Sequence, residues 1–311
     1  MTGGAGFIGS HLCDRLMEEG WQLVVVDNMD PYYDPAVKER NIAGWLTDGR
    51  YRFARVDIRD LNALLELSGE YDVIVHLAAK AGVRPSIIDP NGYQDVNVRG
   101  TQNVLEMARK WGVRQFVFAS SSSVYGLNED LPWREDSCVL RPISPYASTK
   151  VSGELLGHVY STLFGIRFVA LRFFTVYGPR QRPDLAIHKF ARRMIEGKSI
   201  PFFGDGSTRR DYTYVDDIVA GIRAAMDYSS SDYDIFNLGN DQSVGLMEMV
   251  RELERALGLE AIIDKQPEMR GDLPQTWADI SHARQLLGYT PAVGFGEGIA
   301  RFVAWLRTEN N

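Results

Sequence analysis

The first half of the chain alternates short apolar runs with longer segments in which apolar residues recur at helical spacing. The apolar runs cover residues 23–26, 51–56, 73–75, 115–119 and 168–174. Helical patterns lie at 10–19 and 95–111, and another begins at Tyr146. Strands and helices that alternate in this way build a parallel sheet with helices on its faces. The pattern therefore predicts an α/β fold with a doubly wound parallel sheet.

The pattern changes after residue 174. Shorter helices, predicted at 185–196, 245–257, 281–287 and 296–307, alternate with short strands. We therefore expect one domain over 1–174 and a smaller α/β domain over 175–311, with segments near 211–240 packing back onto the first domain. Three loops of the second part carry Arg182, Arg210 and Arg270. Each could be a solvated surface residue, but together they favour recognition of phosphate or carboxylate groups.

A glycine-rich motif, TGGAGFIG, occupies residues 2–9 and leads into the first helical segment. Its glycines permit a tight turn and let backbone N–H groups approach a pyrophosphate at the start of the helix. The strand at 23–26 ends in Asp27, whose carboxylate is placed to accept hydrogen bonds from a ribose diol. Glycine loop, helix, strand and terminal acid, in this order, predict a dinucleotide-binding site.

Asp27 also bears on the choice of dinucleotide. Its charge repels a 2′-phosphate, and Asn28-Met29 supplies no arginine to bind one, so the sequence favours NAD over NADP. Further cofactor contacts are expected after the next two strands. Asp57-Ile58 could read an adenine edge, and Leu77-Ala78-Ala79 are small enough for close approach of the cofactor. The predicted cofactor-binding set is Gly3, Gly6, Phe7, Ile8, Gly9, Asp27, Asn28, Asp57, Ile58, Leu77, Ala78, Ala79, Tyr146 and Lys150.

One element of this pattern is missing. Glycine loops of this kind follow a strand, and here only Met1 precedes Thr2. That strand would lie centrally in the sheet, buried on both faces. We expect that the first strand is truncated and that an apolar segment is encoded upstream of Met1.

The segment between Ser120 and Lys150 carries the candidate chemistry. A run of four serines follows the apolar run at 115–119, and Tyr146 and Lys150 lie four residues apart at the head of a helix. A lysine charge close to a phenol favours the phenolate, so Tyr146 could accept a proton near neutral pH, with a serine hydroxyl relaying the substrate proton. The alternative is an ordinary amphipathic helix, because a Tyr-x-x-x-Lys spacing often arises by chance.

Composition narrows the classes of partner. The 311 residues are 45% hydrophobic and 24% charged, which is typical of soluble globular proteins. A net charge of −7 argues against nucleic acid or an anionic membrane as the main partner. Cys13 and Cys138 suffice for neither a disulfide framework nor a metal site. Without an apolar run of membrane-spanning length or a signal peptide, we expect a cytoplasmic location.

Together these residues resemble the extended short-chain dehydrogenase/reductase family, and within it the nucleotide-sugar 4-epimerases. The resemblance covers nearly the whole chain and includes the glycine loop, Asp27, Asp57-Ile58, the serine run, Tyr146 with Lys150, Arg210-Asp211-Tyr212 and Arg270. It implies NAD held throughout turnover and a UDP-sugar substrate. It also implies a homodimer, formed through the helices near 95–111 and 146–164.

Ser122 and Ser123 separate the branches of this family. Related sugar-nucleotide 4,6-dehydratases carry an Asp-Glu pair at these positions, and decarboxylases carry a Glu just before Val-Tyr-Gly. Elimination of water needs a positioned acid and base, which two serines do not readily supply. Oxidation and re-reduction at C4, which amounts to epimerisation, remains.

The segments RFFTVYGP at 172–179 and AGVR at 81–84 resemble those of UDP-glucuronate 4-epimerases, whereas UDP-glucose 4-epimerases typically have Asn in place of Thr175. Hydroxyls at 122, 123 and 175 can donate neutral hydrogen bonds to a C6 carboxylate. The resemblance implies Ser121, Tyr146 and Lys150 as catalytic residues. It implies a substrate-binding set of Arg84, Ser122, Ser123, Thr175, Arg182, Arg210 and Arg270.

Three alternatives stay open from the sequence. A UDP-glucose or UDP-N-acetylglucosamine 4-epimerase would use the same chemistry on a sugar with a neutral C6. An NAD-sensing protein on this fold would bind without turnover. A one-way reductase would exchange its dinucleotide with solution.

Overall fold

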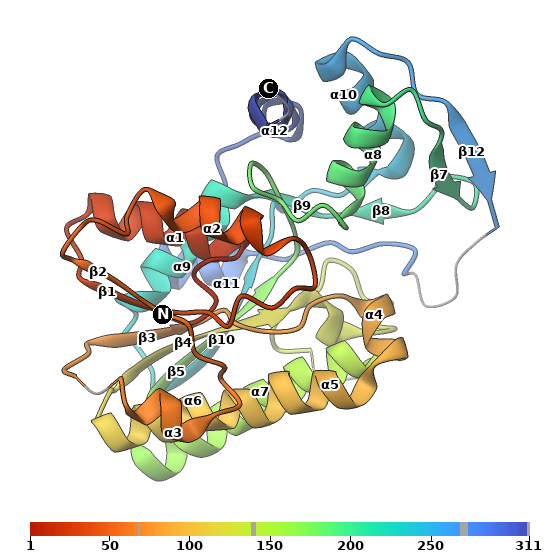
Figure 1. The fold of residues 1–311 in the computed structure, drawn as a ribbon. Helices are drawn as coiled ribbons and strands as arrows, with labels where there is room; N and C mark the ends of the chain where they lie inside the picture. Colours follow the sequence, from red (N-terminus) through yellow and green to blue (C-terminus); the bar gives the residue numbers. More distant parts are fainter. Residues whose placement is uncertain (68, 138–140, 268–272, 310–311) are drawn as a thin grey trace.

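The computed structural model describes residues 1–67, 69–137, 141–267 and 273–309. Its main sheet contains β1 (Leu23–Val26), β2 (Tyr51–Ala54), β3 (Val73–His76), β4 (Gln115–Ser121), β5 (Arg167–Phe173) and β10 (Tyr233–Leu238). β1 pairs with β2, the other four strands pair in the order β3-β4-β5-β10, and every pair is parallel. The predicted doubly wound parallel sheet is confirmed (Figure 1).

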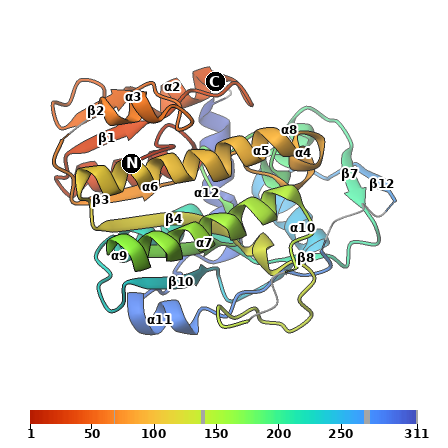
Figure 2. The same ribbon diagram turned by 90° about the horizontal axis from the view of Figure 1, so that it is seen from below.

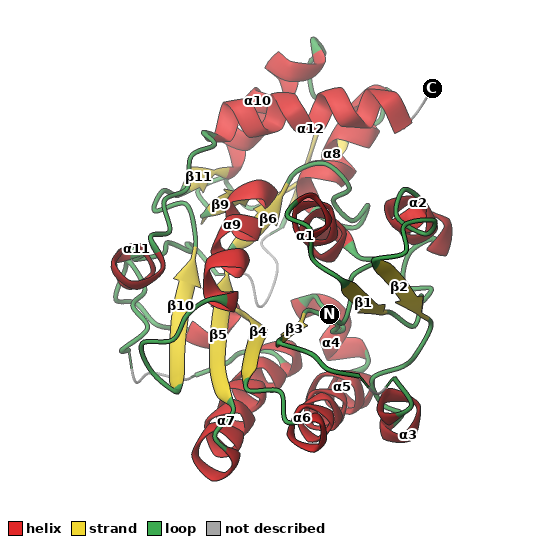
Figure 3. Ribbon diagram, turned by 90° about the vertical axis from the view of Figure 1, so that its left-hand side faces the viewer, coloured by secondary structure: helices red, strands yellow, loops and turns green. Residues whose placement is uncertain are grey.

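Residues 1–3 lie between the two groups of strands. Thr2 forms parallel bridges with Val26 at the end of β1 and with His76 at the end of β3. The amide of Thr2 donates to the carbonyl of Val75 at 2.9 Å, and that of Gly3 to the carbonyl of Val26 at 2.7 Å. Figure 3 shows the N-terminus between β1 and β3. The central position expected for a strand before the glycine loop is therefore taken by these three residues.

Helices cover both faces of the sheet (Figures 1 and 2). One face carries α1 (Phe7–Glu18), α2 (Pro35–Ala43) and α9 (Val215–Met226). The other carries α3 (Leu61–Leu65), α5 (Pro90–Gln94), α6 (Gly100–Trp111) and α7 (Pro145–Phe164). The helix predicted at 95–111 is α6 preceded by one π-helical turn, Asp95–Arg99. Because both faces are covered, Phe116, Val117 and Phe118 in β4 are all buried despite pointing alternately to either side.

Most of the remaining elements lie beyond the carboxyl ends of the strands, whereas the helix at 281–287 packs beside β10 and α9. The helices are α4 (Val83–Ile88), α8 (Ala186–Ile195), α10 (Leu246–Leu257), α11 (Ser281–Leu287) and α12 (Phe295–Glu309). The short strands pair as β6 (Thr175–Tyr177) with β9 (Tyr212–Tyr214), β7 (Ile200–Phe203) with β12 (Ile263–Gln266), and β8 (Arg209–Arg210) with β11 (Val244–Gly245). In the described ranges, no helix is long and apolar enough to cross a lipid bilayer.

The longest helix, α7, lies directly against β4 and β5. The side chain of Ser144 caps its first turn by accepting from the amide of Ala147 at 3.1 Å. Gly153 and Gly157 face the sheet, and a Cβ at either position would overlap the ring of Phe118 or Phe168. Without side chains at these two positions the helix approaches the strands closely. The residues on its sheet-facing side therefore meet the carboxyl ends of β4 and β5.

Candidate active site

A cavity of about 970 Å³ opens at the carboxyl ends of the parallel strands, where ligands bind in sheets of this type. It is lined by every residue of the predicted cofactor-binding set and by the predicted catalytic residues Ser121, Tyr146 and Lys150. It is also lined by Arg84, Ser122, Ser123, Thr175, Arg182 and Arg210 from the predicted substrate-binding set. Arg270, the seventh member of that set, lies outside the described residues.

The glycine loop forms one wall of this cavity. Gly3 has φ of 73°, and a Cβ there would lie 2.6 Å from the backbone nitrogen of Ala78. A Cβ on Gly9 would overlap the carbonyl of Gly3. Helix α1 begins after Gly6 without a side-chain cap, so its first amides remain available to an anion. The loop therefore fits the pyrophosphate of a dinucleotide.

Carboxylates lie at the end of β1 and just beyond β2. The buried Asp27 accepts from the amide of Met29 at 2.9 Å and from Nζ of Lys38 at 3.3 Å. Asp57 accepts from Nδ2 of Asn28 at 2.9 Å, and its hydrogen bonds with Arg59 lower its pKa to about 2. This end of the cavity offers carboxylate oxygens to a ribose and an adenine edge.

Lys150 is buried and Tyr146 is half-buried near the end of β4. Nζ of Lys150 donates to the carbonyl of Ala119 at 2.6 Å and lies 5.9 Å from the centroid of the Tyr146 ring. Burial lowers the pKa of Lys150 to about 8. Burial also raises the pKa of Tyr146. A hydrogen bond with Ser121 and the charge of Arg182 lower it, but by less than burial raises it. Burial thus moves the two pKa values apart, because it disfavours the charged form of each group.

The serine run continues into a turn of 3₁₀ helix, Ser122–Tyr125, beside Tyr146. Oγ of Ser121 accepts from the amide of Ser123 at 3.2 Å and from the Ser123 hydroxyl at 2.9 Å. Thr175 begins β6, which follows β5 directly. Hydroxyls from two neighbouring strand ends thus face the same space as the Tyr146 phenol.

A buried ion pair lies beneath this site. Glu154, one helical turn after Lys150, accepts from Nε of Arg172 at 2.9 Å and from its Nη2 at 2.8 Å. Both side chains are at most 4% exposed. The hydroxyl of Ser120 also donates to Glu154, at 2.5 Å, and the Arg172 guanidinium lies 4.7 Å from the centroid of the Tyr125 ring. The pair ties α7 to both β4 and β5 next to the catalytic candidates.

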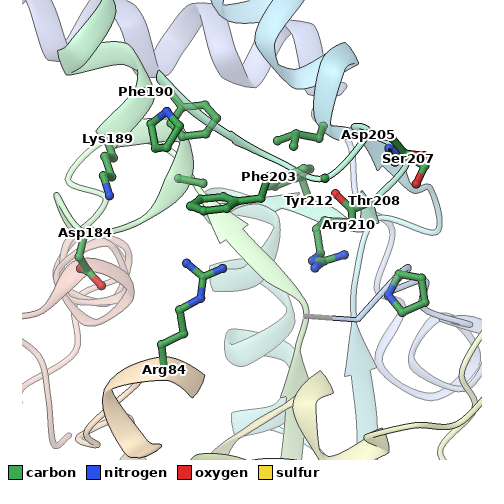
Figure 4. A pocket seen from close by; sticks show the side chains of 15 residues that line it. Arg84, Asp184, Lys189, Phe190, Phe203, Asp205, Ser207, Thr208, Arg210 and Tyr212 are labelled. Atoms are coloured by element: carbon green, nitrogen blue, oxygen red, sulfur yellow. Dashed lines mark hydrogen bonds between the residues drawn. The ribbon is translucent and has the colours of Figure 1, made fainter. Parts of the chain in front are cut away.

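The arginine-rich end of the cavity adjoins a second cavity of about 460 Å³. Arg84, Asp184 and Arg210 line both cavities, so the two are continuous. Figure 4 shows Arg84, Phe203 and Arg210 directed toward one space, and the Arg84 guanidinium lies 5.5 Å from the centroid of the Phe203 ring. An aromatic ring beside two guanidinium groups suits a base and an attached diphosphate.

Arg182 is not a free cation in this structure. Its Nε and Nη2 donate to the two carboxylate oxygens of Asp184, at 2.9 and 2.7 Å, and its guanidinium lies 5.2 Å from the centroid of the Tyr32 ring. The side chain is held in place by this bidentate pair, with Ala81 as a further acceptor at 3.5 Å. An anionic ligand at Arg182 would therefore share the guanidinium with Asp184.

Sequence reasoning missed three of these residues. Lys38 and Asp184 pair with predicted site residues, and no motif or spacing marks either. Glu154 could have been found from the sequence, because a spacing of four places it on the same helix face as Tyr146 and Lys150. Its partner Arg172 lies in a different element, β5, and no spacing in the sequence links the two.

The fold and this cavity define a dinucleotide-binding protein of the Rossmann type. Residues 1–239 match the model of the NAD dependent epimerase/dehydratase family, and the chain belongs to that family. The glycine cradle, the uncapped start of α1 and the Asp27 carboxylate fit the NAD that the family uses.

Several relatives align over nearly the whole chain. A probable UDP-glucuronate 4-epimerase of Rhizobium meliloti (strain 1021) is 39% identical over 98% of this chain and 95% of its own. The crystal structure of UDP-glucuronic acid 4-epimerase from Bacillus cereus with UDP-glucuronic acid and NAD has a TM-score of 0.92 and 38% identity, covering 99% of this chain and 98% of its own. UDP-glucose 4-epimerase from Thermotoga maritima, with UDP-glucose, also has a TM-score of 0.92, at 31% identity, covering 100% and 98%.

The ion pair beneath the site generates a prediction about stability. Glu154→Leu leaves the Arg172 guanidinium buried without a partner, which costs about 3–5 kcal/mol of unfolding free energy. Arg172→Met leaves the carboxylate in the same position. The double variant removes both charges and should lose clearly less than the sum of the two single losses. Urea unfolding with saturating NAD measures all three, and additive losses would contradict the account.

Proposed function

We propose that this protein is an NAD-dependent UDP-glucuronate 4-epimerase, which inverts C4 of UDP-glucuronate through a transient 4-keto sugar to give UDP-galacturonate. The observation that carries the proposal is the group of hydroxyls at Ser122, Ser123 and Thr175, which line one cavity with Tyr146 and Lys150. UDP-glucuronate 4-epimerases among the relatives support the same substrate.

Tyr146 takes the proton from O4 of the sugar as C4 is oxidised, and gives it back on re-reduction. The glycine loop and Asp27 would hold NAD, which would supply a hydride acceptor, and then a hydride donor, for C4 of the sugar. The charge of Lys150 stabilises the Tyr146 phenolate. Ser121, whose hydrogen bond lowers the pKa of Tyr146, bridges the phenol and O4. In these roles Ser121 and Lys150 act against burial, which raises the pKa of Tyr146 and so disfavours its phenolate.

The hydroxyls of Ser122, Ser123 and Thr175 also protect the 4-keto intermediate from loss of CO₂. Oxidation at C4 converts a glucuronate into a β-keto acid, which loses CO₂ readily when an acid assists. Ser122 and Ser123 stand where dehydratases carry Asp and Glu, so the C6 carboxylate meets neutral donors there. Neutral donors hold the carboxylate without protonating the developing carbanion.

The diphosphate is assigned to the arginine-rich end. We assign its binding to Arg182 and Arg210, together with Arg270, while Arg84 and Phe203 border the space for the base. An anchored diphosphate lets the 4-keto sugar turn between its two faces without leaving the protein.

A comparison of two substrates tests the proposal. The wild-type protein should convert UDP-glucuronate to UDP-galacturonate, with little turnover of UDP-glucose, when products are resolved by NMR. Ser122→Ala with Thr175→Ala should lower kcat/KM for UDP-glucuronate roughly 10–100-fold, since each removes a hydrogen bond to a charged group. It should also release UDP-pentose.

Ser148→Ala, which removes a hydroxyl from α7 at a position that does not line the cavity, is the matched control and should leave both rates unchanged. Turnover of UDP-glucose alone would show that the hydroxyl group does not select the acid sugar. The mechanism at C4 would then stand with a different substrate.

The pKa of Lys150 generates a prediction about pH. Its ammonium favours the Tyr146 phenolate, so Lys150→Met removes that effect and raises the pKa of Tyr146. The rising limb of kcat/KM against pH should therefore move to higher pH. Lys198→Met, at an exposed ion pair with Glu196, is the control and should not move it. A rising limb at the same pH in both variants would exclude Lys150 from this role.

We also propose that the protein is a homodimer that associates through α6 and α7. The two helices lie side by side on one face of the sheet (Figure 2). α7 exposes Leu155, Val159 and Leu163, at intervals of four residues. Leu155 and Leu163 are 59% and 66% exposed, which is typical of an apolar face that a partner covers.

Sedimentation equilibrium should give the mass of two chains for the wild-type protein. Leu155→Asp with Leu163→Asp should reduce it to one chain, because charges in an apolar interface are left unpaired. Leu259→Asp, at an exposed leucine away from these helices, should leave the dimer intact. A dimer that survives the α7 double change would place the interface elsewhere.

A further inference from the structure

A buried cation lies at the ribose end of the cofactor cavity. Lys38 belongs to α2, and its side chain is only 9% exposed. Its Nζ lies 3.3 Å from Oδ1 of Asp27, which is 6% exposed, and both residues line the cavity. The two residues that follow Asp27 in sequence carry no cation. The cation at this place comes instead from another element of the fold.

The two carboxylate oxygens of Asp27 differ in their hydrogen bonds. Oδ1 accepts from both Nζ of Lys38 and the amide of Met29. Within the described residues, Oδ2 has no hydrogen-bond donor, so it is left for a ribose hydroxyl. Lys38 also lies over the Tyr33 ring, 5.4 Å from its centroid. The lysine is thus held beside the carboxylate from two sides.

The pair gives this end of the cavity a balanced charge. A buried ammonium is stable when a carboxylate accompanies it, and it becomes a strong anion-binding group when that carboxylate is removed. A 2′-phosphate on the ribose would meet the charge of Asp27 first. Lys38 would also be unable to pair fully with the phosphate, because its ammonium is already paired with Asp27.

We propose that Lys38 can bind a 2′-phosphate and that its ion pair with Asp27 prevents this in the wild-type protein. Asp27 selects NAD in two ways, because it repels the phosphate and because it engages the one buried cation described beside it. Loss of the carboxylate alone turns this chain toward NADP, without introduction of a new basic residue. This inference concerns the cofactor cavity and is independent of which UDP-sugar the protein epimerises.

The test uses full-length Asp27→Ser, Lys38→Met and the corresponding double variant. Isothermal titration with NAD⁺ and with NADP⁺, after removal of bound nucleotide, gives Kd for each. Mass spectrometry of the nucleotide that co-purifies gives a second readout that needs no activity. Asp27→Ser should raise the ratio of NADP⁺ to NAD⁺ affinity roughly 100-fold or more, since repulsion is removed and a charge-assisted bond is gained.

Lys38 must account for part of that gain. The double variant Asp27→Ser/Lys38→Met should lose roughly 10–100-fold in NADP⁺ affinity relative to Asp27→Ser, with a smaller change for NAD⁺. Arg40→Met in the Asp27→Ser background is the matched control. Arg40 lies on the same helix but is 56% exposed and pairs with Glu309, so its loss should leave both affinities unchanged.

Two results would overturn the proposal. One is equal NADP⁺ affinity in Asp27→Ser and in the double variant, which would leave Lys38 as a structural partner of Asp27 alone. The other is a folded Asp27→Ser protein that binds NAD⁺ and gains nothing for NADP⁺. Asp27→Asn keeps the shape of the side chain and must give the same order of affinities if Asp27→Ser is unstable.

Discussion

The close approach of α7 to the ends of β4 and β5 is the constraint on which the rest of the site depends. Gly153 and Gly157 allow it, because a side chain at either position would overlap a phenylalanine ring of the sheet. On the same helix face, Lys150 bonds to the carbonyl of Ala119 and Glu154 bonds to Arg172. A hydrogen bond to the backbone and a buried ion pair therefore hold this face of α7 against β4 and β5.

The charged residues along the cavity are arranged to suit a dinucleotide and a UDP-sugar bound end to end. Carboxylates, with Lys38 beside one of them, lie at the end of the cavity that suits a ribose and adenine, and arginines lie at the end that suits a diphosphate. Serine and threonine hydroxyls, the Tyr146 phenol and the Lys150 amine line the same cavity. Hydride transfer at C4 needs the sugar and the nicotinamide to meet beside these groups. A proton acceptor with a lysine beside it, among neutral hydroxyls, is what oxidation and re-reduction of an acid sugar requires.

Local pattern was enough for part of this account. The parallel sheet followed from short apolar runs between helices. The ribose-binding acid, the Tyr146–Lys150 pair and the serine run each lie where a strand or helix ends, so their positions could be predicted. Lys38, Asp184 and the partner of Glu154 could not, because each contact joins elements whose distance in sequence says nothing about their distance in space. Arg182 illustrates the consequence: sequence marks a free arginine, whereas the fold pairs it with Asp184.

The central claim is that hydride leaves C4 of the sugar and returns to the same carbon within one protein molecule. UDP-glucuronate labelled with deuterium at C4 measures this most directly. The account predicts that UDP-galacturonate formed in ordinary water keeps the deuterium at C4, since the transferred hydride never exchanges with solvent. Replacement of the label by protium from water would contradict it, because inversion would then proceed by removal of a proton.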